Sequence, residues 1–583
     1  MNKFSYLKLL FIFLVGYGCD VNQSPQITQE ERAASLSGPN SGEEGSEEEE
    51  TNSENRQTIH AEALAIGSEM SIELKEDLVG AGLTEQEADV IAQSAEADAT
   101  VTADSLAIFS LASRSPTASE IAPAFLRGAM QGLALDGNGL GNGEDRAKLA
   151  EIVLSSTFGA INGHTKGWQS DTRDELEDKM AVMGLEQISN AGIPSDFHAT
   201  ATSSVLKGTV SALENSGVAQ SALVETIDRL VNVSLDSIEK STLDPMVRST
   251  SIANVTSGSV AGLNTLAVSD EERMAVPGNL AQQSVQSVYR SGFTDDMLKY
   301  SISTISFQTG ASILNAGFAS TSDKATAMQN ISKNMGEEVV SQVKNGNGDD
   351  TLEQLQGTLP LISSGLISSL DEAQLASSDA IENDVPKKIM AGAISSLKDS
   401  GLDPQQSTTL AGDVTSSAVQ ATENIVITDE TVREDIIGGI VAGSSEEIEA
   451  AGITEEGSIH TAISHVTERA IAALADTSLP AENYDEAAAK IIGSAIAATP
   501  MLDQGKTTYT NDLDHGVSTV MEAGIAALTK HKVDGKISAE VLKNGAKKST
   551  TAALNEIGEI KNEGIISRKE VEPLSLAIAT SPK

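Results

Sequence analysis

The sequence is poor in cysteine and in aromatic residues. Among 583 residues, Cys19 is the only cysteine, Trp168 is the only tryptophan, and aromatic residues make up 3% of the chain. A single cysteine excludes an intramolecular disulfide, so folding must rely on burial, which covers a rising fraction of the surface as a chain lengthens. With few aromatic side chains, a core of Ala, Val, Ile, Leu and Met has to pack its small side chains closely.

Basic residues are also scarce. The sequence has 39 Lys and Arg residues against 84 Asp and Glu residues, which gives a formal net charge of −45. Such a chain repels phosphate backbones and anionic lipid headgroups, so we expect no nucleic-acid partner and no membrane binding through a basic patch. Cationic partners and divalent cations are attracted instead.

Long apolar runs are missing after residue 19. No later stretch approaches the roughly 18 consecutive apolar residues of a transmembrane helix, so we expect no further membrane span. About 565 residues follow this point, which is enough for three or four ordinary domains or for one long repeat array.

The segment Met1–Cys19 has the pattern of an export signal. Lys3 and Lys8 give it a positive start, residues 9–15 are apolar, and the small residues Gly16 and Gly18 come shortly before the cysteine. A positive region, a short apolar stretch and small residues at a cleavage point are typical of signal peptides. The segment resembles the type II signal peptide of bacterial lipoproteins.

The resemblance implies that residues 1–18 are removed and that Cys19 is lipidated, with a diacylglyceryl group and an acyl chain such as palmitate. Gly16 stands where the family usually has leucine, and an ordinary signal peptide or a short membrane anchor is the alternative. The lipid would hold the protein in the cell envelope of a bacterium. Asp20 resembles the inner-membrane retention signal of enteric bacteria, but we expect the outer membrane or the cell surface.

Residues 19–57 are expected to form a lipidated, disordered and acidic tether. Residues 42–50 consist mainly of glutamate and glycine, and Arg32 and Arg56 are the only basic residues between positions 20 and 57. Little in this segment could offset the entropy of ordering, and like charges extend it. The prediction is a spacer that separates a folded body from the membrane.

From Ile59 onward the pattern predicts an all-α fold. Apolar residues recur at three- and four-residue spacing, which is the stripe of an amphipathic helix. Two such stripes are Leu206, Val210 and Leu213, and Met390, Ile394 and Leu397. Alternation with a period of two is scarce, so a sheet is not expected.

Internal similarity predicts a helical repeat array of αα-hairpin-like units with a period of about 50 residues. A glycine followed by small and apolar residues recurs in two series, Gly159, Gly208, Gly258 and Gly310, then Gly392, Gly439 and Gly493. Further copies at Gly128, Gly365 and Gly524 fall between these, as a partner helix would. A glycine inside a helix costs about 0.5–1 kcal/mol relative to alanine, so its repeated use indicates a neighbouring backbone close by. Chance coincidence in a Gly-, Ala- and Ser-rich chain is the alternative.

The turns favour the same architecture. Gly82, Gly292, Gly401 and Gly452 are each followed by an apolar residue and then by Thr or Asp. The glycine is expected to end one helix in the left-handed conformation, and the Thr or Asp to cap the next. The spacing also predicts capping boxes in residues 84–87 and 567–570.

Two Gly/Asn/Asp-rich stretches, residues 136–145 and 344–350, are expected to be flexible connections. The second could divide the array into a first lobe of helical repeats, 58–343, and a second lobe, 351–583. A calcium loop needs oxygen ligands at fixed positions, and Ala147, Gln356 and Lys561 occupy such positions in the three best alignments. Capped turns are the preferred interpretation, and calcium binding stays open.

No catalytic, cofactor-binding or metal-binding residue can be assigned from the sequence. Residues 505–507 (Gly-Lys-Thr) look like the end of a P-loop, but Pro500 stands where its first glycine belongs. His460 and His465 are five residues apart and would not share one helix face. Ser-x-x-Lys occurs at residues 204–207, 237–240 and 395–398, as expected by chance in a Ser-rich helical chain, and no Gly-x-Ser-x-Gly elbow is present.

The leading hypothesis is therefore a lipid-anchored, non-catalytic envelope lipoprotein whose repeat body is a binding or structural scaffold. Repeat arrays expose extended faces because each unit contacts only its neighbours. Its expected contacts are the membrane, through the N-terminal lipid, and an unknown protein or other envelope partner. The alternative is a hydrolase that processes envelope polymers with residues gathered from distant repeats, so the question of enzymatic activity stays open.

Overall fold

The computed structural model describes residues 46–109, 118–135, 143–165, 170–346, 351–427, 429–477, 479–499 and 512–562. In these ranges the chain forms 20 α-helices and short 3₁₀ turns, and no strand. The prediction of an all-α fold is confirmed. The chain divides into two units, Met1–Asn55 and Arg56–Lys583.

The first described helix begins inside the range assigned to the tether. Helix α3 spans Ser46–Gly80, so residues 46–57 are helical where a disordered spacer was expected to continue. Most of the acidic residues of that stretch are glutamates, which are good helix formers despite their like charge. The lipidation site Cys19 and residues 20–45 lie outside the described residues.

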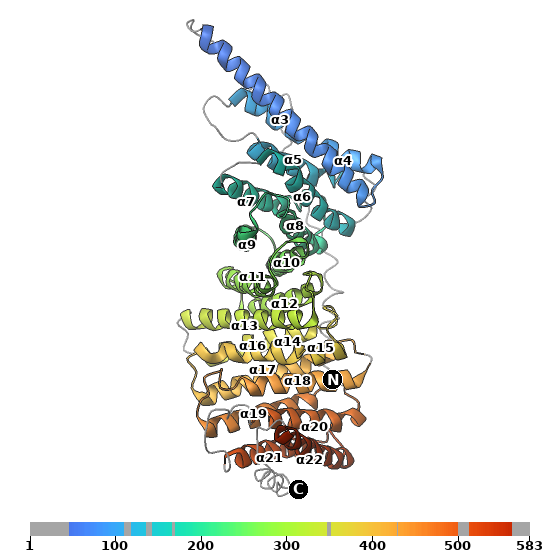
Figure 1. The fold of residues 1–583 in the computed structure, drawn as a ribbon, viewed down its shortest axis with the longest axis vertical. Coiled ribbons are helices and arrows are strands. Elements are labelled where there is room, and N and C mark those ends of the chain that lie inside the picture. The colour runs from blue at the N-terminus through green and yellow to red at the C-terminus, as the bar shows by residue number, and fades with distance from the viewer. Residues whose placement is uncertain are drawn as a thin grey trace. The chain divides into compact units, whose positions relative to one another are not determined.

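Most helices of the second unit fall into two rows, and each helix contacts the next helix of its own row. The first row consists of α6 (Gly143–Thr165), α8 (His198–Ala212), α10 (Pro245–Gly262), α12 (Asp295–Ser312), α14 (Thr351–Ser368), α17 (Pro404–Ala421), α19 (Glu456–Leu474) and α21 (Asp512–Val533). The second row consists of α5 (Ala118–Gly132), α7 (Ser170–Glu186), α9 (Leu223–Lys240), α11 (Asp270–Arg290), α13 (Thr321–Asn345), α16 (Val385–Ser395), α18 (Glu430–Glu446), α20 (Ala481–Ala498) and α22 (Ala539–Asn562). Figure 1 shows the helices from α13 to α22 stacked in successive layers, with α13 above and α21 and α22 below.

The other elements lie outside the two rows. They are α3, α4 (Glu85–Phe109), which packs against α5, the short helix α15 (Ser378–Glu382), and the 3₁₀ turns η1 (Ser195–Phe197), η2 (Gln220–Ala222), η3 (Leu263–Thr265), η4 (Ile313–Asn315), η5 (Ser396–Asp399) and η6 (Thr422–Asn424). First-row helices begin at residues 143, 198, 245, 295, 351, 404, 456 and 512, which are 47–56 residues apart. The predicted unit of two helices and about 50 residues is therefore confirmed.

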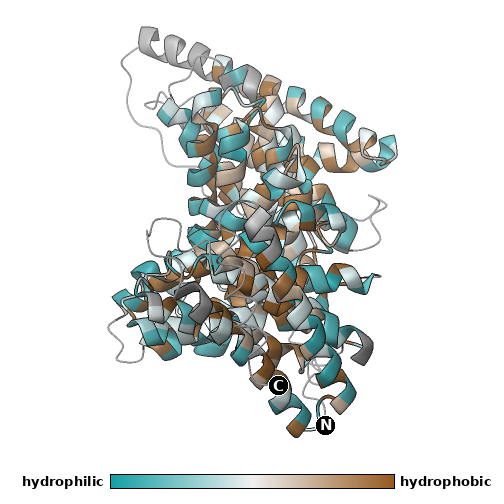
Figure 2. Ribbon diagram, turned by 60° about the horizontal axis from the view of Figure 1, so that its bottom comes forward, coloured by the Kyte–Doolittle hydropathy of each residue, from teal (hydrophilic) through white to brown (hydrophobic). Residues whose placement is uncertain are grey.

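The predicted apolar stripes are buried. Leu206, Val210 and Leu213 have no exposed surface, and neither do Met390, Ile394 and Leu397. Figure 2 shows hydrophobic and hydrophilic residues on different sides of many helices. The core is aliphatic, and many buried hydroxyls bond to a carbonyl of the preceding turn, as Thr209 Oγ1 does to the oxygen of Val205 at 2.8 Å. The core therefore packs without many aromatic side chains.

The four turn glycines adopt the predicted conformation. The φ angles of Gly82, Gly292, Gly401 and Gly452 are +104°, +65°, +77° and +88°. This left-handed region is costly for residues that carry a Cβ, which explains the glycine at each position. The apolar residues that follow, Leu83, Phe293, Leu402 and Ile453, pack against the core as expected.

The predicted caps are present at two of the four turns. In the capping box of Thr84, its amide donates to Oε2 of Glu87 at 2.8 Å, and the amide of Glu87 donates to Oγ1 of Thr84 at 3.3 Å. Asp403 caps α17 in the same way. Thr294 makes no capping hydrogen bond, and α19 begins after Glu455 without a side-chain cap. Residues 567–570 lie outside the described residues.

The packing of helices continues past residues 344–350. Helix α14, which follows this stretch, contacts α12 and α13, and α16 contacts α13. The boundary expected between two lobes therefore does not coincide with an interruption of the two rows. The stretch 347–350 itself lies outside the described residues, as do residues 136–142.

Several repeat glycines lie where two helices of one row approach each other. A Cβ built on Gly208 would lie less than 3.0 Å from the carbonyl oxygen of Glu151 in α6, and one on Gly258 would meet that of Ser203 in α8. Gly392 stands in the same relation to Gln329 in α13. Real Cβ atoms do not come this close to a backbone oxygen, so these positions exclude every other residue at the observed helix separation.

The two glycine series belong to different rows. Gly159, Gly208, Gly258 and Gly310 lie on first-row helices, whereas Gly392, Gly439 and Gly493 lie on second-row helices. The predicted close approach of a neighbouring backbone holds unevenly along both series. A Cβ on Gly159 would meet the side chain of Glu73, and one on Gly310 would meet that of Ser369, so neither glycine faces a backbone. In α18 the tight position is Gly443 and not Gly439, and a Cβ on Gly493 would sit 3.4 Å from that of Ala552, an ordinary contact.

The glycine contacts generate a stability prediction. Gly208→Ala and Gly392→Ala should each lower the free energy of unfolding, because the new methyl group must push two backbones apart, at a typical cost of about 1–3 kcal/mol. The matched control is Gly493→Ala, which has room for the methyl group and should be neutral or stabilising by up to about 1 kcal/mol through helix propensity. Urea denaturation followed by circular dichroism measures all three variants. If the three variants were equally stable, the spacing of the glycines would be a coincidence and not a requirement of helix packing.

Candidate functional site

The sequence motifs that suggested chemistry are not brought together. His460 and His465 both lie on α19 but contact different helices. The ring of His460 lies against Gly516 of α21, where an added Cβ would come 2.8 Å from its Nε2. The ring of His465 lies against Gly412 of α17, where an added Cβ would come 2.7 Å from its Cδ2. The two rings therefore face different neighbours, as their spacing predicted. Burial lowers the pKa of His465.

The remaining motifs make structural contacts or lie outside the described residues. Lys207 pairs with Glu151 at 2.8 Å, and Ser395 Oγ donates to the carbonyl oxygen of Gly392 at 3.0 Å. The P-loop-like residues 505–507 are not described. Within the described ranges, no group of three or more His, Cys, Asp or Glu side chains is placed to hold a metal ion.

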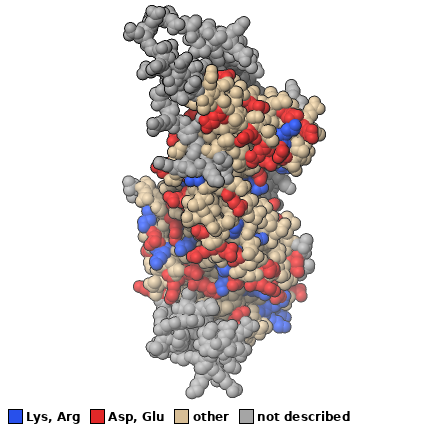
Figure 3. Space-filling view, turned by 45° about the horizontal axis from the view of Figure 1, so that its top comes forward, with Lys and Arg blue, Asp and Glu red and all other residues tan. Residues whose placement is uncertain are grey.

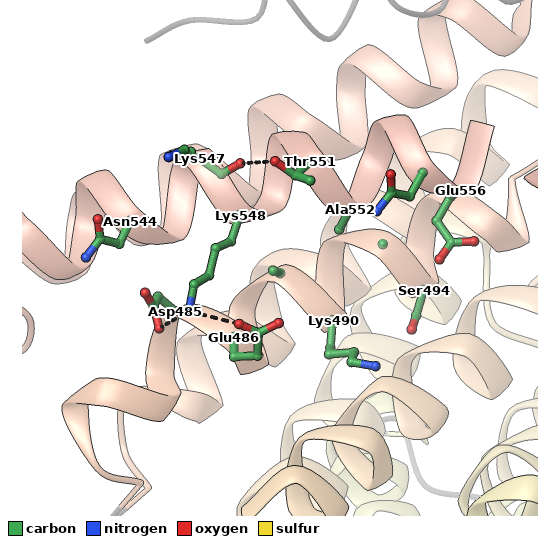
Figure 4. A pocket seen from close by; sticks show the side chains of 13 residues that line it. Asp485, Glu486, Lys490, Ser494, Asn544, Lys547, Lys548, Thr551, Ala552 and Glu556 are labelled. Carbon is green, nitrogen blue, oxygen red and sulfur yellow. Dashed lines mark hydrogen bonds and ion pairs between the residues drawn. The ribbon is translucent and has the colours of Figure 1, made fainter. Parts of the chain in front are cut away.

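A groove lined by polar side chains lies in the second row, between α20 and α22. Its volume is about 710 Å³, and its walls carry charged and polar side chains from both helices. Helix α20 supplies Asp485, Glu486, Lys490 and Ser494, and α22 supplies Asn544, Lys547, Lys548, Thr551, Asn555 and Glu556. Figure 4 shows Lys548 of α22 reaching across the groove to Asp485 and Glu486 of α20.

One lysine bridges the groove at one end. Lys548 Nζ lies 2.8 Å from Oε2 of Glu486 and 3.1 Å from Oδ1 of Asp485, the second contact being an ion pair without hydrogen-bond geometry. The hydrogen bond to Glu486 raises the pKa of Lys548. Lys490 pairs with Asp435 of α18 at 2.7 Å, and this hydrogen bond raises its pKa in turn. Both lysines therefore stay charged at neutral pH.

Small residues form the floor of this groove. Ala489 and Gly493 face Ala552, and the separation of the two helices at Gly493 corresponds to ordinary contact. The lining includes neither histidine nor cysteine. The arrangement is suited to holding a ligand by ion pairs and hydrogen bonds, and it offers no base next to a nucleophile.

A second polar cluster joins α7 and α9. Nη2 of Arg229 lies 2.8 Å from Oε2 of Glu177 and 3.2 Å from Oδ1 of Asp174, and Nη1 contacts Asp178. The side chain of Glu177 is 3% exposed, and its other carboxylate oxygen has no hydrogen-bond partner. Burial is the largest effect on Glu177 and raises its pKa to about 7, although Arg229 acts in the opposite direction.

Sequence reasoning missed these sites, although one signal was available. Ion pairs join consecutive helices of a row and therefore recur about one repeat unit apart in sequence. Examples are Lys207 with Glu151, Arg290 with Glu239, Lys387 with Glu446, Lys490 with Asp435, and Lys548 with Glu486. A search for opposite charges at the repeat spacing would have found them.

No protein-family model matches this chain, and a comparison with curated proteins finds no match. Among the described residues, no helix is both long enough and apolar enough to cross a membrane.

The buried carboxylate generates a pH prediction. In the unfolded chain Glu177 titrates near its ordinary pKa of 4.5, and in the folded protein near about 7. Between these values the unfolded state has already lost a proton that the folded state retains, so stability falls as pH rises from about 4.5 to about 7. Glu177→Gln removes this loss and can still accept a hydrogen bond from Arg229.

The substitution Glu177→Gln should therefore raise the melting temperature of the protein at about pH 8 and change it much less at about pH 4. Thermal melting followed by circular dichroism at both values is the measurement. Glu225→Gln, which neutralises an exposed carboxylate on α9, serves as the control. A shift of Glu177→Gln that is the same at both pH values would contradict the account.

Proposed function

We propose that the protein is a lipid-anchored scaffold of a bacterial cell envelope, held in the membrane through Cys19 and binding partners through its helical array. The proposed location is the outer membrane or the cell surface. The observation that carries the proposal is the two-row array, in which a groove lined by charged and polar side chains opens between α20 and α22. Such an array offers many equivalent surfaces, which suits binding or structural support.

The charge of the body supports a role in contacts with proteins or other envelope components. Asp and Glu side chains outnumber Lys and Arg over the face shown in Figure 3, in line with the net charge of −45. This excess of one sign favours solubility and repels nucleic acids and anionic headgroups. The attachment to the membrane is therefore assigned to the N-terminal lipid and not to the surface of the array.

The groove between α20 and α22 supports binding better than hydrolysis. An envelope-processing hydrolase would need an acid or nucleophile placed next to a group that activates it. The acidic residues Asp485 and Glu486 are instead neutralised by Lys548. These three groups are suited to recognising a polar partner, and the lipid keeps the site at the membrane.

The anchor is tested by Cys19→Ser. Loss of the acceptor thiol should release the protein from the membrane fraction or leave an uncleaved precursor, and should abolish the incorporation of labelled palmitate. Detergent-phase partitioning and metabolic labelling are the measurements, with Ser24→Ala as a control that leaves the cysteine in place. A Cys19→Ser protein that partitions like the unmodified chain would overturn the lipid anchor.

A further inference from the structure

The two rows differ in how closely their helices approach between α5 and α11. In the first row, α6, α8 and α10 make extensive contacts, and glycines at positions 208 and 258 let their backbones come together. In the second row, α7, α9 and α11 contact one another much less. Helix α9 contains no glycine, and Gly184 of α7 faces first-row side chains. The second-row helices are therefore held apart by side chains.

A groove of about 630 Å³ opens where α7 and α9 separate. Val182 and Leu185 of α7 form one apolar wall, and Val233 with Leu243, which follows α9, forms the other. Leu185 is buried, and the other three are partly exposed in the described structure. An aliphatic side chain of a bound peptide would cover the exposed parts of these residues.

The rim of the groove carries two carboxylates and one lysine. Glu186 is exposed at the end of α7, and Asp236 lies on the opposite wall with a side chain that is 48% exposed. Lys240 and Arg290 each lie 3.7 Å from Asp236, and Arg290 is closer to Glu239, at 3.0 Å. Lys240 is 78% exposed and therefore holds Asp236 weakly.

The groove also lies at the carboxyl ends of two helices. Helix α7 ends at Glu186 and α9 at Lys240. The last carbonyl groups of a helix carry partial negative charge and favour a nearby cation. A lysine or arginine side chain entering between Glu186 and Asp236 would meet two carboxylates and these helix ends.

We propose that the groove between α7 and α9 binds a segment of a partner protein in which an aliphatic residue stands next to a lysine or arginine. The aliphatic side chain packs between Val182 and Val233, and the cation pairs with Glu186 and Asp236. The net charge of the chain attracts a basic partner at long range, and the groove gives the contact its position. The inference depends on the proposed scaffold role but not on the lipid anchor.

The chain's own acidic stretch does not fit this groove. Residues 42–50 carry six glutamates and no basic residue, so they would be repelled by the rim. A partner of opposite charge is the occupant that the residues favour. Association of a second copy of this chain would instead make the oligomeric state depend on protein concentration.

The test uses the purified full chain and a synthetic peptide in which pairs of leucine and lysine residues alternate. Fluorescence anisotropy of the labelled peptide measures its Kd, and a peptide with glutamate in place of lysine is the reference. We expect the lysine peptide to bind and the glutamate peptide not to bind. Glu186→Lys should weaken binding by about tenfold, because it replaces an attraction for the peptide's cation by a repulsion.

Two variants separate the groove from the general acidity of the chain. Glu225→Lys makes the same change of charge at an exposed position in the first turn of α9 and should alter the Kd less than about twofold. Lys240→Glu removes the competing cation and should tighten binding. Val233→Asp should abolish the site, with circular dichroism showing that the fold is retained.

Equal weakening by Glu186→Lys and Glu225→Lys would overturn the proposal, because it would show attraction to overall charge. Failure of the lysine peptide to bind would overturn it as well, and so would concentration-dependent self-association that Val233→Asp abolishes. Membrane association through Cys19 is measured independently. A result that excludes peptide binding at the groove therefore leaves the proposed lipid anchor standing, and the two proposals can be tested separately.

Discussion

The close approach of helix backbones at glycine positions is the constraint on which the array depends. At Gly208 and Gly258 the place that a Cβ would take is occupied by a carbonyl oxygen of the preceding first-row helix. Helices that come this near can bury small side chains between them, which a sequence with 3% aromatic residues requires. The hydroxyls of Ser249 and Ser301, for example, lie 2.7 Å apart between α10 and α12. The aliphatic core and the buried hydroxyls both follow from this separation.

The local features could be predicted from the sequence because they depend on neighbouring residues. The stripe of Leu206, Val210 and Leu213 follows from the helical period alone, and the left-handed Gly82 and Gly401 follow from turn chemistry. The row to which each glycine belongs could not be predicted, since the spacing is the same in both rows. The first-row series continues past Gly310 at Gly365 of α14, whereas Gly392 lies on α16 of the second row, so the two series are separate sets of contacts.

The candidate sites were harder to predict because they depend on separations between helices. Nothing near Asp485 or Lys548 in the sequence distinguishes them from other charged residues of an acidic chain. They become a site only because α20 and α22 pack side by side with a groove between them. The same holds for Glu177, whose environment is set by Arg229 from the next helix of the row. Between α7 and α9 the second-row helices approach less closely than their first-row neighbours, and a groove opens there as well.

The central claim is that helices one repeat unit apart in sequence are direct neighbours, and a disulfide tests it most directly. With Cys19→Ser as background, the pair Ser249→Cys and Ser301→Cys places two thiols where the structure has two hydroxyls in contact. Mild oxidation followed by thiol counting and mass analysis under denaturing conditions should show an intramolecular bond. The pair Ser249→Cys and Ser363→Cys, which joins α10 to the more distant α14, should keep both thiols. Free thiols in the first pair after oxidation, or equal crosslinking of both pairs, would contradict the account.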